Sequence, residues 1–293
     1  MSTTPDRWPL DGVLSDGLLL DGATGTELLA RGVAVDRPGW TAAATVESPD
    51  VLRAVHADYV AAGAGAITAN TFRMHRRNVE PLGLEAAPLV QTAVDIARDA
   101  AGSEVAVLGC IAPLADCYDA AAVPDARSLQ AEHTRHASHL AAAGVDAAII
   151  ETMTTTTEAV VAAQAAREVG LPVLASVAIA ADGRLYSGEP LDEAADALRE
   201  ARAAAVLANC FPFTLGDELA ANLQQVLGSA TPWGLQPNTS RLTDTGEWAV
   251  DGDTSPAAFA DAAARWRSMG AAVIGGCCGT TPEHIAAAAR LLE

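Results

Sequence analysis

The stretch GVDAAIIETMTTTTEAVVAAQAAREVGLPVLASV, residues 144–177, decides the fold. Its apolar run Ala147–Glu151 has the length of a buried strand. An alanine-rich helical pattern, Thr156–Val169, follows and ends at Gly170, where helix C-terminal glycines belong. A second apolar run, Val173–Val177, comes directly afterwards. Strand, helix and strand in this order are typical of a βαβ unit, in which a crossover helix joins two parallel strands.

The same unit recurs along the chain in both directions. The strand candidates are Leu18–Asp21, Ala66–Asn70, Val105–Cys110, Ala147–Glu151, Val173–Val177, Ala205–Cys210, Trp233–Gln236 and Ala272–Gly276. The clearest helical patterns are Pro49–Ala62, Ala86–Ala101, Leu129–Ala143, Thr156–Val169 and Pro256–Met269. This repetition predicts an α/β fold, a single (β/α)8 TIM-type barrel, and a doubly wound open sheet is the alternative. No Pro- or Ser-rich linker divides residues 1–293, so we expect one domain.

Composition narrows the class of function. The net charge of −19 at pH 7 leaves no basic surface in bulk, so we expect no nucleic-acid partner. An acidic surface favours the approach of cationic small molecules; the alternative is that it only increases solubility. No apolar run reaches the roughly 18 residues that span a membrane, and the segment 1–7 lacks a secretory pattern. We therefore expect a cytoplasmic protein, in which cysteines are more often metal ligands or reactive thiols than disulfides.

The stretch GGCCGTTP, residues 275–282, puts two cysteines on one glycine-rich turn after the last predicted strand. Cys210 also ends a strand, and three thiolates meeting there would form a zinc site with its fourth position free. Strand spacing alone favours Cys210 only weakly over Cys110, which ends another strand. Structural cysteines, or a disulfide between Cys277 and Cys278, are the alternatives.

Two carboxylates share the same predicted rim, since Asp21 and Glu151 also end strands and barrel enzymes carry their functional residues there. Together they could bind the ammonium group of an amino acid. The small-residue turn after Asp21 leads into a helix near Thr24, whose free N–H groups could hold a substrate carboxylate. The alternative is that Asp21 and Thr24 only cap this helix.

The remaining polar residues carry weaker signals. Three histidines, His133, His136 and His139, recur every third residue, which predicts an outward helix face. We expect the basic cluster that follows the second strand to be a solvated loop, or else a contact for an anionic part of a substrate; its members are Arg73, His75, Arg76 and Arg77. Cys117 has no predicted partner.

Several motifs together resemble the homocysteine S-methyltransferase family. They are DGATGT (21–26), NTF (70–72), ET (151–152), NC (209–210), QPN (236–238) and GGCCGTTP (275–282). The resemblance extends from about Leu18 to the C-terminus and implies a zinc enzyme on a (β/α)8 barrel. It implies that Cys210, Cys277 and Cys278 are the metal ligands and catalytic residues. It also implies a homocysteine site formed by Asp21, Gly22, Trp40, Thr71 and Glu151, in which Asp21 and Glu151 bind the amino group and the turn at Gly22 binds the carboxylate.

The methyl donor is the least determined part of this prediction. Betaine-using members carry tyrosines where this chain has Arg73 and Thr152, and they extend further at the C-terminus, whereas this sequence ends at Glu293. Folate- and corrinoid-binding domains of the cobalamin-dependent members are not visible either. The resemblance therefore favours a stand-alone enzyme that transfers a methyl group to homocysteine from S-methylmethionine or S-adenosylmethionine, giving methionine.

Other functions stay open. The donor could be betaine or methyl-folate, and the acceptor another thiol or selenol. A non-catalytic zinc-binding barrel is a further alternative, and so is a zinc hydrolase, although hydrolases usually bind zinc through His and carboxylate ligands. The expected partners are small-molecule substrates, and the sequence does not fix the oligomeric state.

Overall fold

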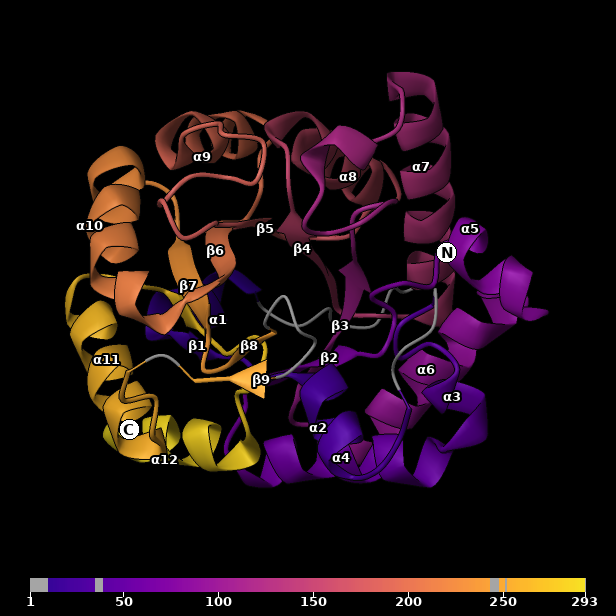
Figure 1. The fold of residues 1–293 in the computed structure, drawn as a ribbon, viewed down its shortest axis with the longest axis horizontal. Helices are drawn as coiled ribbons and strands as arrows, with labels where there is room; N and C mark the ends of the chain where they lie inside the picture. The colour runs from indigo at the N-terminus through magenta and orange to yellow at the C-terminus, as the bar shows by residue number, and fades with distance from the viewer. Residues whose placement is uncertain (1–9, 35–38, 243–247, 251, 293) are drawn as a thin grey trace.

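The computed structural model describes residues 10–34, 39–242, 248–250 and 252–292. Eight parallel strands are hydrogen-bonded in the order β1-β10-β7-β6-β5-β4-β3-β2. A parallel bridge between Leu20 and Ala66 joins the two ends of this sheet. Helices surround the ring of strands (Figure 1). The predicted (β/α)8 barrel is thereby confirmed, and the alternative of an open sheet is excluded. The segment 1–7, for which the sequence predicted no secretory pattern, lies outside the described residues.

The strands begin close to the predicted positions. The barrel is formed by β1 (Leu18–Leu19), β2 (Ala66–Ala69), β3 (Ala106–Ile111), β4 (Ala147–Met153), β5 (Val173–Ala178), β6 (Ala205–Pro212), β7 (Trp233–Asn238) and β10 (Val273–Ile274). A separate antiparallel hairpin pairs β8 (Arg241–Leu242) with β9 (Trp248–Ala249). The last barrel strand is shorter than predicted, because the chain leaves the sheet at Gly275 to form the cysteine turn.

The helices connect the strands and cover the barrel. They are α1 (Leu10–Asp16), α2 (Thr24–Ala30), α3 (Ala44–Glu47), α4 (Pro49–Ala61), α5 (Arg76–Val79), α6 (Ala86–Ala101), α7 (Ala126–Ala143), α8 (Thr156–Glu168), α9 (Leu191–Glu200), α10 (Gly216–Leu227), α11 (Pro256–Ser268) and α12 (Pro282–Leu292). Short 3-10 turns lie at η1 (Glu80–Leu82), η2 (Ala120–Ala122) and η3 (Phe213–Leu215). The predicted helix Ala86–Ala101 coincides with α6.

The apolar core has two parts. Inside the barrel, buried side chains such as Leu108, Ile149 and Leu207 form one cluster, and Leu10 and Leu14 of α1 belong to it. Because α1 immediately precedes the start of β1, it covers the amino-terminal end of the barrel. A larger cluster fills the space between strands and helices.

Two strands are distorted at those carboxyl ends. The register of β4 against β5 shifts after Ile150, and that of β6 against β7 shifts after Asn209. Within these irregular segments Thr152 has φ 62° and Cys210 has φ 53°. Such left-handed conformations cost on the order of 1–3 kcal/mol in residues other than glycine. The Asn209 side chain links the two distortions, because it accepts from the Thr152 N–H at 3.1 Å and donates to the Thr152 hydroxyl at 3.0 Å.

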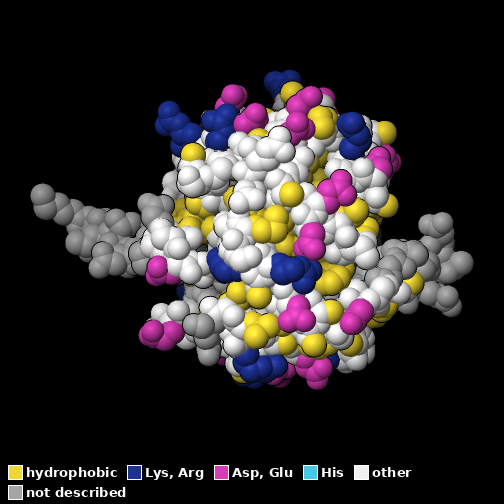
Figure 2. Space-filling view, turned by 90° about the vertical axis from the view of Figure 1, so that its left-hand side faces the viewer, with side chains coloured by type: hydrophobic (Ala, Val, Ile, Leu, Met, Phe, Trp, Pro, Cys, Tyr) yellow, Lys and Arg dark blue, Asp and Glu magenta, His cyan; other side chains and the backbone are white. Residues whose placement is uncertain are grey.

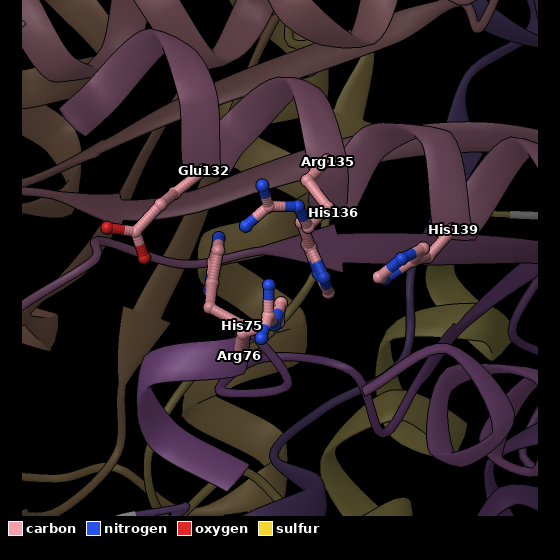
Figure 3. Close-up of a pocket in the computed structure, with 6 residues that line it drawn as sticks. All are labelled: His75, Arg76, Glu132, Arg135, His136 and His139. Atoms are coloured by element: carbon pink, nitrogen blue, oxygen red, sulfur yellow. The ribbon is translucent and has the colours of Figure 1, made fainter. Parts of the chain in front are cut away.

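The predicted outward face of α7 is wrong for two of its three histidines. His133 and His136 are buried, and only His139 is partly exposed. The segment leading into α5 covers them. The ring centroid of His75 lies 4.3 Å from that of His136 and 5.3 Å from that of His133. Figure 3 shows His75 next to His136. His133 also contacts the buried carboxyl of Glu158 at 3.1 Å. We call His75, His133 and His136 the histidine layer.

The neighbouring basic residues follow the solvated-loop prediction only in part. Arg76 and Arg77 are exposed and form ion pairs with Glu80 and Glu132, respectively. His75, by contrast, is buried, and neither of its ring nitrogens has a hydrogen-bond partner within the described residues. The cluster therefore splits into a solvated ion-pair surface and a buried imidazole.

Charges of both signs are dispersed over the surface. On the face shown in Figure 2, arginine and acidic side chains alternate with polar and apolar ones and do not gather in a single patch. Across the described parts of the chain, helices that combine the length and the apolarity of a membrane span are not found.

Candidate active site

Three cysteine sulfurs converge at the carboxyl ends of β6 and β10. The Sγ atoms of Cys210, Cys277 and Cys278 all lie within 4.8 Å of one another. Cys210 is buried, whereas Cys277 and Cys278 are partly exposed. In the described residues this is the one group of His, Cys, Asp or Glu side chains close enough to hold a metal ion. Cys110, the rival candidate from sequence, lies outside it.

The three thiols cannot all carry a negative charge by themselves. Hydrogen bonds from the Cys210 and Cys277 thiols lower the pKa of Cys278 well below its usual range. Hydrogen bonding to Cys210 and to Cys278, together with burial, raises the pKa of Cys277 well above its usual range. One thiolate therefore forms readily and opposes the ionisation of its neighbours. A soft divalent cation relieves this repulsion, so the donor set fits a thiolate-bound metal such as zinc.

Backbone hydrogen bonds fix the cysteine turn on the end of β7. The Cys277 N–H donates to the Pro237 carbonyl at 2.8 Å, and the Cys278 N–H donates to Asn238 Oδ1 at 3.0 Å. Gly279 has φ +82°, and a Cβ there would lie 2.1 Å from Ser240 Oγ. Only glycine fits that position, which explains the glycine after the cysteine pair. The two sulfurs are therefore held by a scaffold that does not depend on a metal.

Asp21 lies at the end of β1 with 2% of its surface exposed. Its carboxylate accepts the Thr68 N–H at 2.8 Å and the Thr68 hydroxyl at 3.1 Å, both from β2. Burial raises the pKa of Asp21 to about 7, and the nearby Glu151 charge contributes. The N-terminal flank of α2 is Ala23, which makes no side-chain cap, so the capping alternative for Asp21 and Thr24 is not seen. Asp21 is a buried acid that still lacks a cationic partner within the described residues.

Glu151 lies at the distorted end of β4 and contacts residues of the adjacent strand β3 and of the more distant strand β7. Its Oε2 accepts from the Cys110 thiol at 3.1 Å, and its Oε1 accepts from Gln236 Nε2 at 3.2 Å. Burial raises the pKa of Glu151. Because both donors are neutral, neither compensates a full negative charge. We call Asp21, Glu151 and the three converging cysteines the rim cluster.

Three further residues predicted from sequence lie around this cluster. Gly22 approaches the cysteine turn so closely that a Cβ would lie 2.9 Å from the Thr280 carbonyl oxygen. Trp40, partly buried with φ 51°, covers Gly25 at the start of α2. Thr71 is fully buried, and its hydroxyl is engaged with the backbone of Cys110 at 2.8 and 3.0 Å. The structure thus brings Gly22 next to the metal-site loop, whereas Thr71 lies behind Cys110.

Two tyrosines near the cysteines were missed in the sequence. Tyr118, after β3, and Tyr186, after β5, form an edge-to-face pair with ring centroids 5.4 Å apart. The Tyr118 hydroxyl is within hydrogen-bonding reach of Cys278. Burial, and then the charge of Cys210, raises the pKa of Tyr186 to about 12. Both tyrosines are in irregular loops without periodicity, and their place after barrel strands was the only available signal.

Cys117, for which the sequence offered no partner, lies in the same loop as Tyr118. It is almost fully buried, with 9% of its surface exposed. Burial raises the pKa of its thiol, and a hydrogen bond to Arg73 opposes that rise. It lies outside the group of converging sulfurs.

Together, the closed barrel, the three converging thiols and the two acids define a class: (β/α)8 proteins with a three-cysteine cluster at the strand ends. Residues 18–292 match the family described as "Homocysteine S-methyltransferase". The chain belongs to that family.

Individual relatives agree with this assignment. The chain is 31% identical to the homocysteine S-methyltransferase of Escherichia coli (strain K12), over 95% of this chain and 97% of the relative. It is 28% identical to homocysteine S-methyltransferase 4 of Zea mays, over 94% and 89%, respectively. The crystal structure of the E. coli homocysteine methyltransferase MmuM in its metallated form superposes with a TM-score of 0.81 at 28% identity, covering 97% of this chain and 99% of that one.

Proposed function

We propose that this protein is a zinc-dependent methyltransferase that moves a methyl group from a sulfonium donor to the thiol of homocysteine, giving methionine. The observation that carries the proposal is the convergence of three cysteine sulfurs within 4.8 Å at the barrel rim that also carries the buried carboxyl of Asp21 and the partly buried carboxyl of Glu151. Family membership supports the reaction, and the geometry supports the residues.

Zinc is the ion that best suits this donor set. Cys210, Cys277 and Cys278 would hold it, since thiolate ligands select soft or borderline ions and a three-residue set leaves a position for substrate. When bound, Zn²⁺ lowers the pKa of an incoming thiol and keeps that sulfur available as a nucleophile. The Thr152 hydroxyl, 3.9 Å from the Cys210 sulfur, would help to orient that ligand.

The two acids of the rim cluster would recognise the amino group of homocysteine. In the substrate-free protein, burial leaves the Asp21 and Glu151 carboxyls with raised pKa values. A primary ammonium group supplies the cation that both lack. The turn at Gly22, next to the cysteine loop, would receive the substrate carboxylate, and Trp40 would cover the site. Thr71 would act indirectly, through its bonds to Cys110.

A sulfonium donor fits the tyrosine pair, and its leaving group needs no acid to protonate it. Aromatic faces attract cations, and Tyr118 and Tyr186 adjoin the cysteines. The homocysteine thiol would release its proton to solvent, and the resulting thiolate would attack the methyl carbon; a new S–CH3 bond forms as the old S⁺–CH3 bond breaks. The leaving group is a neutral thioether and needs no protonation. With S-methylmethionine as donor, both products are methionine.

A donor screen tests this function. Zinc-loaded enzyme with homocysteine is offered S-methylmethionine, S-adenosylmethionine, betaine or methyl-folate, and methionine is measured. Turnover with either sulfonium, and its loss on chelation, is the expected result. Methyl transfer from betaine or folate alone, or undiminished activity without metal, would contradict the proposal.

A further inference from the structure

Cys110 is a buried cysteine outside the group of three converging sulfurs. It is 1% exposed and belongs to the apolar interior of the barrel. Its thiol hydrogen nevertheless has an acceptor, Oε2 of Glu151, at 3.1 Å. We propose that Cys110 is a positioning residue, whose thiol holds the Glu151 carboxylate in the orientation that receives the amino group of the acceptor. This inference rests on the function proposed above.

The Cys110 backbone is unusually well fixed. Its N–H donates to the Thr71 hydroxyl at 2.8 Å, and the same hydroxyl donates to its carbonyl at 3.0 Å. His136 Nε2 contacts that carbonyl as well, at 3.0 Å. The carbonyl can only accept, so His136 carries its proton on Nε2. Two elements outside β3, the loop after β2 and helix α7, thus restrain the residue that carries the thiol.

The other side of Glu151 shows why this restraint matters. Gln236 Nε2 donates to Oε1 at 3.2 Å from β7, while Cys110 donates to Oε2 from β3. Each carboxylate oxygen therefore has one side-chain donor, Cys110 from the adjacent strand β3 and Gln236 from β7, which lies three strands from β4 in the other direction around the barrel. Removing the thiol leaves Oε2 without a donor, and the carboxylate is then free to rotate about its side-chain torsions. Its remaining lone pairs would no longer be directed toward the ammonium group.

A thiol is well suited to this task. Burial, reinforced by the Glu151 charge, raises the pKa of Cys110, so the sulfur keeps its hydrogen and remains a donor. An S–H group is also a weak donor, which leaves most of the negative charge of Glu151 for the ligand. A serine hydroxyl at the same position would preserve the orientation, whereas a methyl group would not.

Calorimetry with homocysteine tests the proposal on the zinc-loaded full-length protein. Cys110→Ala should weaken homocysteine binding about tenfold, the size expected for one hydrogen bond to a charged group. Cys110→Ser should stay within about threefold of the wild type. Val94→Ala, which truncates a buried residue of α6 away from the site, controls for loss of packing. Zinc content and melting temperature are measured for all three variants.

A second acceptor separates positioning from a structural role. 4-Mercaptobutanoate has the thiol and carboxylate of homocysteine but no amino group. Cys110→Ala should raise KM for homocysteine about tenfold with little change in kcat, and leave kcat/KM for 4-mercaptobutanoate unchanged. Equal losses with both acceptors, or unchanged homocysteine affinity, would overturn the proposal. If the wild type binds homocysteine but transfers no methyl group, the proposed function fails while the binding comparison still decides the role of Cys110.

Discussion

The rim cluster and the histidine layer are both buried polar groups, yet they differ in what they leave unsatisfied. In the rim cluster, Asp21 and Glu151 accept hydrogen bonds from neutral donors and lack a cation among the described residues. In the histidine layer, rings pack on one another, and His133 pairs with Glu158. The rim cluster thus lacks a positive charge, whereas the histidine layer leaves four ring nitrogens without a hydrogen-bond partner within the described residues: both of His75, and Nδ1 of His133 and of His136.

Position in the barrel accounts for this difference. The rim cluster lies at the carboxyl ends of β1, β4, β6 and β10, where bulges and left-handed residues turn side chains toward a common mouth. The histidine layer is formed by His133 and His136 of α7 and by His75 of the segment that leads into α5, and Figure 3 shows His75 and His136 between these two elements. Burial of polar groups does not by itself indicate a site, whereas a place at the strand ends of a barrel favours one.

The largest expected effect comes from the metal centre. Cys278→Ala removes one of three sulfur ligands, and both bound zinc and methyl transfer should be lost. Loss of a Lewis acid worth about 4 kcal/mol corresponds to about a thousandfold in rate. Metal content by mass spectrometry and methionine formation are measured together. Cys117→Ala, which lies outside the converging sulfurs, should keep its zinc; if it loses as much metal as Cys278→Ala, the ligand set is wrong.

The next effect concerns the acids of the rim cluster. Glu151→Gln keeps the shape of the side chain but removes its charge, so homocysteine affinity should fall about 50-fold, or about 2–3 kcal/mol. Zinc affinity should change little, because Glu151 is not among the converging sulfurs. Titration of zinc and of homocysteine distinguishes the two roles. An equal loss of zinc affinity and of homocysteine affinity would show that Glu151 stabilises the fold and does not bind homocysteine.

The two clusters should respond to pH with opposite signs. The pKa of Asp21 is about 7 in the folded chain against 3.8 unfolded. As the pH falls from about 7.5 to about 5.5, the folded state takes up a proton that the unfolded state does not, which stabilises the fold by about 2 kcal/mol. Asp21→Asn should abolish this gain in urea unfolding without homocysteine. An unchanged pH dependence would mean that Asp21 is already ionised.

The histidine layer should lose stability over the same pH interval. Burial lowers the pKa of His136 to about 4, against 6.5 unfolded. Below pH 6.5 the unfolded chain therefore binds a proton that the folded chain excludes, a loss of about 1 kcal/mol near pH 5.5. His136→Leu should remove that loss from the unfolding curves. His56 lies outside the layer, and burial also lowers its pKa to about 4, so His56→Leu should likewise reduce the loss of folding stability at low pH. If neither variant changes the pH dependence of unfolding, burial of these histidines is not its cause.

Much of the fold was predictable because it depends on short, repeated patterns. Apolar runs mark the barrel strands, and glycine-terminated helices such as α7 separate them. Helix α1 was missed because its seven residues, LDGVLSD, contain too little periodicity. The β8–β9 hairpin was missed because each of its strands has two residues. Elements this short are stabilised by contacts that are not local in sequence.

Candidate site residues were predictable from the sequence where they lie at the ends of predicted strands. Residues that contact them from within a strand or from a distant segment were not predictable. The barrel rule placed Cys277 and Cys278 at the rim but left Cys210 and Cys110 both open, and the family resemblance was needed to choose Cys210. Thr68, which binds Asp21, lies within a strand and carries no distinguishing pattern. The outward prediction for His133 and His136 was wrong because the covering segment is about 60 residues away in sequence, and periodicity cannot reveal it.

X-ray absorption at the zinc edge tests most directly whether three cysteines hold a metal that receives the homocysteine thiol. Before substrate, zinc in the purified protein should have three sulfur neighbours at about 2.3 Å and one lighter atom. With homocysteine, the lighter atom should be replaced by a fourth sulfur. Fewer than three sulfurs at rest, or a coordination shell that homocysteine does not change, would contradict the mechanism.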